Sequence, residues 1–170
     1  MIAEDQSARL ESFLNDTPLL DILGYRDERG FSVLALSAFK NSEASFMLFV
    51  EYARRQNVGA ERMRIWADMR TDELFTAVHF AAYHGNLPIT RVLVEEMGCD
   101  IFAQNLFGAN VLHISAQGDS PVTLYYFVNT HMMSVDSVDE RGSTPLHWAC
   151  YARAEFAINF LLAMNAQLEL

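Results

Sequence analysis

The sequence has little positive charge and no long hydrophobic run. Asp and Glu outnumber Lys and Arg by 22 to 12, which gives a formal net charge of −10. An acidic chain lacks the basic surface that displaces phosphate counterions, so general nucleic-acid binding is excluded. Hydrophobic residues make up 51% of the chain, yet they form no stretch of 18 apolar residues. We therefore predict no membrane-spanning helix in these 170 residues.

Motifs for catalysis and for metal binding are also missing. The sequence contains no Gly-rich phosphate loop, Cys-x-x-Cys pair, His-Glu-x-x-His motif or nucleophile elbow. Its two cysteines, Cys99 and Cys150, are far apart, and we expect both to be buried thiols. The start, Met1 to Asp5, is too polar for a signal peptide, which indicates a cytoplasmic location. We predict no catalytic residue, no metal site and no cofactor, so this chain is not itself an enzyme.

What the chain does have is an internal repeat of 34 residues, seen at 76–82, 110–116 and 144–150. A polar lead residue, a histidine and a pair of small residues recur in register. The repeat motif comprises Thr76, His79, Asn110, His113, Thr144, Pro145, His147 and Trp148. A period near 33 residues with a Thr-Pro-Leu-His-x-Ala core resembles ankyrin repeats, each a β-turn and two antiparallel helices. The predicted fold is therefore an all-α ankyrin-repeat solenoid of helix–turn–helix repeats with β-turn fingers.

The residue types of the motif suit the start of a helix. The lead residue, Thr76 for example, caps the first turn with its side-chain oxygen, and Pro145 lies where no N–H is needed. The resemblance implies that each histidine hydrogen-bonds back to the capping residue and across to neighbouring backbone. The large apolar residue after the histidine, as in Trp148, is expected to face the core. The small residues behind it, Cys150 among them, are expected to lie between helices.

The pattern divides the chain into repeats of unequal quality. The letters DERG at 27–30 recur at 139–142, which places a degenerate first copy upstream, with Ala35 where the histidine should be. The predicted segments are N-terminal capping helices or a degenerate repeat at 1–26, a degenerate repeat at 27–53, an insertion at 54–70, and repeats at 71–104, 105–138 and 139–170. The last helix is strongly apolar without a polar capping neighbour, so the stack is interpreted as truncated. Self-association through that edge is expected.

The register also predicts which side chains face outward. In ankyrin units the finger tips and the exposed ends of the first helices form a continuous concave face. The residues predicted to bind protein there are Phe31, Phe39, Lys40, Phe75, Tyr83, His84, Phe107, Gln117, Arg141 and Tyr151. Exposed aromatic and arginine side chains are typical of interaction hot spots. The alternative interpretation is that several of them pack beneath neighbouring fingers.

The C-terminal half carries a narrower resemblance. Residues 108–168 contain Gly-Ala-Asn-Val-Leu-His-Ile-Ser-Ala-Gln-Gly-Asp, then Leu-Tyr-Tyr-Phe, then Asp-Glu-Arg-Gly-Ser-Thr-Pro-Leu-His-Trp-Ala-Cys-Tyr. This stretch resembles the N-terminal ankyrin region of DHHC-type palmitoyltransferases (protein S-acyltransferases), particularly the protist branch. The resemblance implies that cytosolic repeats recruit substrates while a membrane-embedded Asp-His-His-Cys zinc domain transfers the acyl group. That sequence is absent here, so no catalytic residue is carried over.

Three classes of function remain open from the sequence. The first is a protein- or peptide-binding module that recruits substrates on the cytosolic face of a membrane DHHC palmitoyltransferase. The second is a fragment of an unrelated soluble ankyrin scaffold or regulatory protein. The third is an enzyme in its own right, which the missing motifs disfavour.

Overall fold

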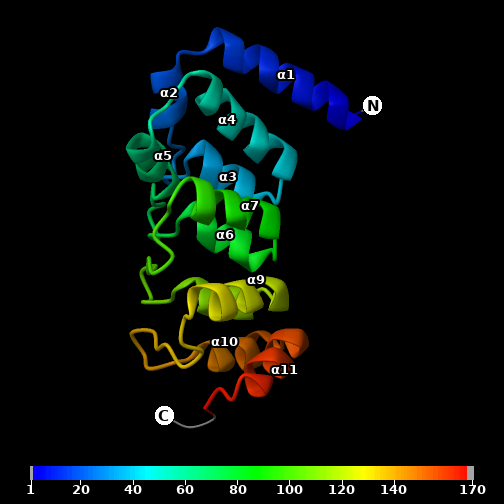
Figure 1. Cartoon of the computed structure of the whole chain (residues 1–170), viewed down its shortest axis with the longest axis vertical. Helices are drawn as coiled ribbons and strands as arrows, with labels where there is room; N and C mark the ends of the chain where they lie inside the picture. Colours follow the sequence, from blue (N-terminus) through cyan, green and yellow to red (C-terminus); the bar gives the residue numbers. More distant parts are fainter. Residues whose placement is uncertain (1, 168–170) are drawn as a thin grey trace.

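The computed structural model describes residues 2–167 as a stack of short helices, with the two ends of the chain at opposite ends of the molecule (Figure 1). No strand is present in this part of the chain, which confirms the all-α fold class. The helices are α1 (Ile2–Asp16), α2 (Leu19–Gly24), α3 (Val33–Phe39), α4 (Glu43–Arg55), α5 (Ala60–Ala67), α6 (Ala77–Tyr83), α7 (Leu87–Arg91), η1 (Val92–Glu96), α8 (Val111–Gln117), α9 (Pro121–Tyr125), η2 (Tyr126–Thr130), α10 (Pro145–Ala152) and α11 (Glu155–Ala163).

The first helices of the repeats, α3, α6, α8 and α10, pack on one another in chain order. Each is short because a polar residue caps its start and a turn follows within seven or eight residues. In α6, α8 and α10 the capping residue and the histidine three positions later form a reciprocal capping box. This arrangement satisfies backbone groups that the first turn would leave unpaired.

The second helices cover the first ones on one side. α7 and α9 each continue into a wider π-helical turn, η1 and η2, so that the two inner repeats have the same irregular outer layer. Their apolar faces are fully buried against the first helices, as shown by Ile89, Leu93, Leu124 and Phe127. The core is therefore a continuous strip between two layers of helices, as expected of a solenoid.

The fingers between repeats are held by a polar residue at the start of each turn. Asp139 Oδ1 accepts hydrogen bonds from the amides of Arg141 at 2.9 Å and Ser143 at 2.8 Å. Asp27 and Asn105 do the same in their own fingers. The backbone bonds between consecutive fingers run from the amides of Asp72, Leu106 and Glu140 to the carbonyls of Arg29, Glu73 and Phe107, at 3.1 Å each. The fingers therefore form a ladder along one edge of the stack.

Segment 54–70, interpreted from the sequence as an insertion, contains the additional helix α5. Met63, Trp66 and Ala67 on this helix are buried, while Arg62 and Arg64 are exposed. Trp66, 2% exposed, is among the largest fully buried side chains. The segment is therefore part of the hydrophobic core and not a loop on the surface.

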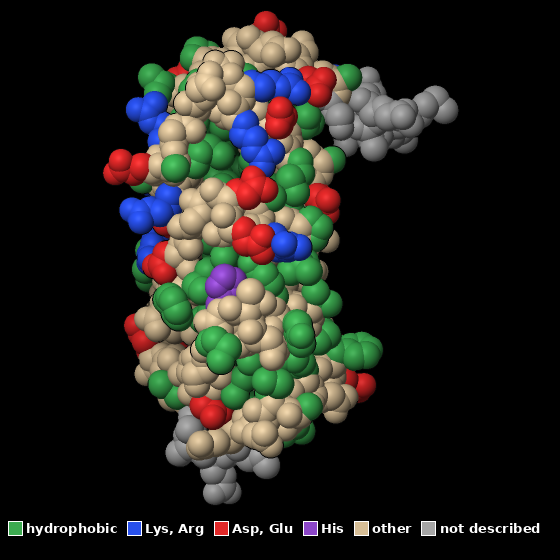
Figure 2. All heavy atoms as spheres, viewed as in Figure 1, with side chains coloured by type: hydrophobic (Ala, Val, Ile, Leu, Met, Phe, Trp, Pro, Cys, Tyr) green, Lys and Arg blue, Asp and Glu red, His purple; other side chains and the backbone are tan. Residues whose placement is uncertain are grey.

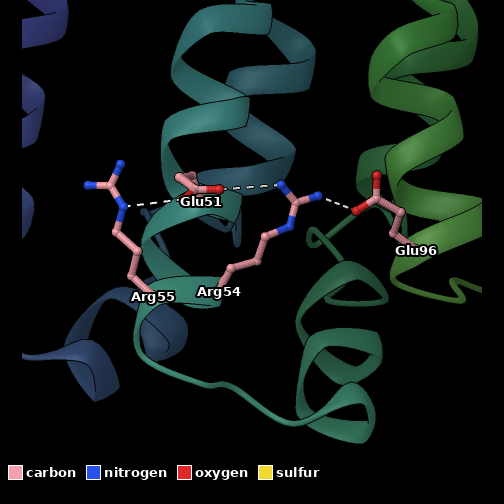
Figure 3. Close-up of polar contacts among 4 residues, drawn as sticks. All are labelled: Glu51, Arg54, Arg55 and Glu96. Carbon is pink, nitrogen blue, oxygen red and sulfur yellow. Dashed lines mark hydrogen bonds and ion pairs between the residues drawn. The ribbon is translucent and has the colours of Figure 1, made fainter.

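A set of surface ion pairs joins α4 to η1 (Figure 3). Glu51 accepts from Arg54 and Arg55, and Arg54 also reaches Glu96 in the next repeat. The Arg54 and Glu96 side chains are 45% and 50% exposed, so water and salt screen their attraction.

We expect Arg54→Ala to change the free energy of unfolding by less than about 0.5 kcal/mol, because exposed ion pairs contribute little. Urea denaturation of the variant and of Arg55→Ala, which removes only the contact within α4, checks this. A loss above about 1 kcal/mol for Arg54→Ala alone would show that the bridge between repeats is structural.

Candidate functional site

The largest hollow described in the molecule lies between the third and fourth fingers and the ends of two first helices. Its volume is about 470 Å³, enough for one or two side chains of a partner. It is lined by Phe107, Gln117, Asp139, Arg141, Ser143, His147, Trp148 and Tyr151. Four of these, Phe107, Gln117, Arg141 and Tyr151, belong to the concave face that the sequence predicted.

Each wall of the hollow comes from an element of the repeat. Phe107 and Arg141 are at equivalent finger positions 34 residues apart, and Gln117 and Tyr151 are at equivalent ends of α8 and α10. Trp148 projects from the middle of α10 and forms the back wall. Because Thr144 caps α10 by accepting from the His147 amide, the orientation of this helix is fixed at its first turn.

Trp148 is held in place by a hydrogen bond that the sequence analysis did not foresee. Its indole Nε1 donates to Asp139 Oδ2 at 2.9 Å, while Asp139 Oδ1 holds the finger amides. Partial burial raises the pKa of Asp139, but the hydrogen bonds from Trp148 and from the Ser143 and Arg141 amides outweigh it, so the pKa is lowered. The charged carboxylate thus ties the indole to the finger and leaves one ring face toward the hollow.

The equivalent space between the first two repeats is filled by the protein's own phenylalanines. Phe31 stacks on Phe80 with ring centroids 5.2 Å apart and an interplanar angle of 20°. Phe39 contacts both rings edge-on at 5.4 Å, and Phe75 lies 5.4 Å from Phe80. Between the last two repeats, Ala109 and Gln117 occupy the positions of Phe31 and Phe39, and Trp148 that of Phe80. The smaller residues leave the hollow open beside Trp148.

This comparison separates the predicted concave residues into two groups. Phe31, expected to face outward, is only 4% exposed and packs beneath the second finger, so that expectation is wrong. Phe75 is half-buried in the same cluster. The alternative interpretation of packed aromatics therefore applies to the N-terminal repeats. The exposed members of the predicted set are Phe39, Lys40, Tyr83, His84, Phe107, Gln117, Arg141 and Tyr151.

Three further expectations about the last repeat are corrected. Trp148 was expected in the core, but it is half-buried and lines the hollow. Cys150 was expected between helices, but it is exposed. His147 is exposed, whereas its equivalents His79 and His113 are 0% exposed. In each case the inner repeats bury the position against the following repeat.

The chemistry of the remaining groups is that of a scaffold. Within residues 2–167, no three His, Cys, Asp or Glu side chains are close enough to hold a metal ion. Burial raises the pKa of the Cys99 thiol to about 12, so this thiol is not activated as a nucleophile. No helix in the same part of the chain has the length and apolar character needed to cross a membrane.

Comparison with known proteins gives two matches. A family model for ankyrin repeats, described as three copies, matches residues 78–170. The palmitoyltransferase AKR1 of Lachancea kluyveri is 31% identical over 97 residues, which are 55% of this chain and 13% of that protein. The chain thus spans only a small part of that relative. The matched residues of the family model include every residue that lines the hollow.

Proposed function

Because the chain belongs to the ankyrin-repeat family, we propose that it is a protein-interaction module whose hollow beside Trp148 receives a side chain of the partner. The observation that carries this proposal is the open ring face of Trp148, framed by Phe107 and Tyr151. Tyr151 is 93% exposed and Phe107 is 48% exposed, so both lose apolar surface to water when a partner binds. Exposed aromatics around a concave pocket are what partner-binding sites contain.

The shape of the hollow favours an apolar anchor, and an aromatic ring above all. Phe31 and Phe39 fill the equivalent space between repeats 1 and 2 by stacking on Phe80. A partner ring on Trp148 would reproduce that packing where Ala109 and Gln117 leave room. Stacked aromatic pairs contribute about 0.5–1.5 kcal/mol beyond the area they bury.

The charge around the hollow favours a partner segment with basic character. Only three of the twelve Lys and Arg residues, Arg91, Arg141 and Arg153, follow residue 70, against eleven of the 22 acidic residues. Figure 2 shows Lys and Arg gathered over the upper half of the face that it draws, and mainly hydrophobic side chains over α9 and α11. A basic segment is therefore attracted to the C-terminal repeats by long-range electrostatics.

The parent protein that best suits this module is a membrane DHHC palmitoyltransferase, with the repeats recruiting substrates on the cytosolic side. Support comes from the Thr-Pro-Leu-His-Trp-Ala unit at 144–149 and from the partial similarity to a protein named palmitoyltransferase. Sequencing the full-length transcript tests this assignment. Hydrophobic spans flanking a Cys-rich Asp-His-His-Cys segment in the same reading frame would support it, and their absence would favour a soluble scaffold or regulatory protein.

We expect Tyr151→Ala to weaken partner binding at least tenfold, or about 1.4 kcal/mol, without a change in the melting curve. The probes are peptides selected from a random display library on the purified chain, with affinities measured by calorimetry. The selected sequences should share an aromatic or large apolar residue near a basic one. Tyr125→Ala is the matched control, because Tyr125 is 60% exposed on α9, away from the hollow.

Two outcomes would contradict the proposed site. Equal losses for the Tyr125 and Tyr151 variants would show that binding does not depend on the hollow. Loss of binding in Arg62→Ala with Arg64→Ala, while Tyr151→Ala binds normally, would move the partner to α5.

A further inference from the structure

The surface of the last repeat that faces away from repeat 3 differs from every other surface of the stack. We call it the end face and define it by the Arg141 carbonyl, His147, Cys150 and Leu162. It is distinct from the hollow, because it consists of positions that inner repeats use to contact the following repeat. Three kinds of contact across the inner boundaries establish this.

The first contact is a hydrogen bond from histidine. The amide of Thr76 donates to Nδ1 of His79 at 3.1 Å, so the opposite ring nitrogen, Nε2, carries the proton. That Nε2 lies 3.1 Å from the carbonyl of Ala103 in the following repeat. Nε2 of His113 lies 3.0 Å from the carbonyl of Ser143 in the same way. His147 shares the Nδ1 arrangement through the Thr144 amide and therefore presents Nε2–H on the end face.

The second contact is the backbone ladder of the fingers. The Phe107 carbonyl accepts from the Glu140 amide at 3.1 Å, as the Glu73 carbonyl accepts from Leu106. The carbonyl of Arg141 is at the position of Phe107 in the last finger. It is the acceptor to which a further finger would donate.

The third contact is apolar burial, and it identifies the direction in which each residue faces. Ala82 and Ala116 are 0% exposed, whereas the equivalent Cys150 is exposed. Val128 is 8% exposed, whereas the equivalent Leu162 is 44% exposed. These positions become exposed only in the last repeat, so they face along the stack.

A different pair of equivalent residues supports that interpretation. Val122 is 51% exposed and Phe156 is 68% exposed. Both face solvent sideways, because the inner repeat exposes this position as much as the last one does. High exposure of Phe156 is therefore a property of the outer helices and not of the end face.

The main chain also turns toward a further finger after α11. The amide of Gln167 donates to Asp136 Oδ1 at 2.9 Å. The amide of Asp100 donates to Asp68 Oδ1 at 2.8 Å at the equivalent point, just before the third finger. The backbone near Gln167 is thus held in the orientation that leads into a finger.

From these contacts we propose that the end face binds one further ankyrin-type repeat, joined in line to the same polypeptide. Such a repeat would supply a finger amide to the Arg141 carbonyl, a carbonyl to His147 Nε2 and apolar side chains over Cys150 and Leu162. A second copy of the chain does not offer this set. Its opposite end is covered by α1 and α2, whose Leu14 and Ile22 are buried (Figure 1).

The test adds a consensus ankyrin repeat with a polar outer face after Leu170 and compares thermal unfolding of the two proteins. We expect the melting temperature to rise by ~5 °C or more, because a terminal repeat is stabilised by its neighbour. Hydrogen exchange of the α11 amides should become at least tenfold slower in the extended protein.

Two lysine substitutions locate the effect. Leu162→Lys should leave the melting temperature of the 170-residue chain nearly unchanged but remove most of the gain in the extended protein. Phe156→Lys, on the same helix and facing sideways, should keep the gain. No gain in the extended protein, or an added repeat whose amides remain unprotected, would overturn the proposal. Concentration-dependent dimers of the 170-residue chain that Leu162→Lys abolishes would assign the face to a second copy instead.

Discussion

Replacing Gly118 by alanine is expected to destabilise the protein by about 3 kcal/mol, because the added methyl group has no space. An ideal Cβ at Gly118 would lie 2.0 Å from the carbonyl oxygen of Tyr83 and 2.7 Å from its carbonyl carbon. These are backbone atoms at the end of α6, so no side chain can rotate away. Separating α6 from α8 is the remaining response, and it opens the boundary between repeats 2 and 3.

That boundary cannot relax cheaply, because polar contacts fix the same segment of α6. Ser120 Oγ donates to the Tyr83 carbonyl at 2.8 Å, and Thr123 Oγ1 donates to the Ala82 carbonyl at 2.9 Å. A shift large enough for a methyl group would lengthen both bonds. Each lost buried hydrogen bond adds about 1 kcal/mol to the cost.

Thermal and urea unfolding of Gly118→Ala, compared with Gly24→Ala, measures this effect. Gly24 has no atom within 4 Å of its ideal Cβ and ends α2, so alanine there should be neutral or slightly stabilising. If Gly118→Ala melts like the parent chain, the packing of α6 against α8 is looser than the structure indicates.

The repeat fold was predictable because its determinants are local in sequence. A capping residue, a histidine three positions later and a pair of small residues specify the start and the packing face of a first helix, as in Asn110 and His113. The family match and the helical architecture confirm that prediction. The buried position of Trp66 was harder to foresee, because segment 54–70 has no counterpart in the other repeats.

The binding surface was less predictable, because exposure at one repeat depends on residue size in the next. Phe31 and Ala109 are equivalent by register, but one covers Phe80 and the other leaves Trp148 open. The same holds for Cys150, whose register predicts burial and whose exposure follows from its place in the last repeat. Asp139 could have been identified from the sequence, since a half-buried indole N–H requires an acceptor.

The free energy of unfolding is expected to fall by about 2–3 kcal/mol between pH 6.5 and pH 4.5, chiefly through His79. This side chain is 0% exposed. Burial lowers its pKa from 6.5 to about 4, with the positive charge of Arg70 acting in the same direction. The hydrogen bond to Ala103 and the charge of Asp100 oppose the shift but do not overcome it.

The sign follows from the protonation states. In the folded protein His79 stays neutral down to about pH 4, whereas in the unfolded chain it binds a proton below about pH 6.5. The unfolded state therefore gains protons first, and stability that is complete above pH 6.5 is lost as the pH falls. Burial also lowers the pKa of His113, so this residue adds to the loss in the same direction.

Urea unfolding at pH 7.5, 6.5, 5.5 and 4.5 measures the dependence, and His79→Gln isolates the contribution of His79. Glutamine cannot be protonated, so the variant should be less stable at pH 7.5 but lose less stability on acidification. The window avoids most carboxylate titration, because Asp139 and Glu95 have lowered pKa values. Equal slopes for the two proteins would mean that His79 does not titrate differently on folding. The hydrogen bond from its Nε2 to the following repeat would then survive protonation.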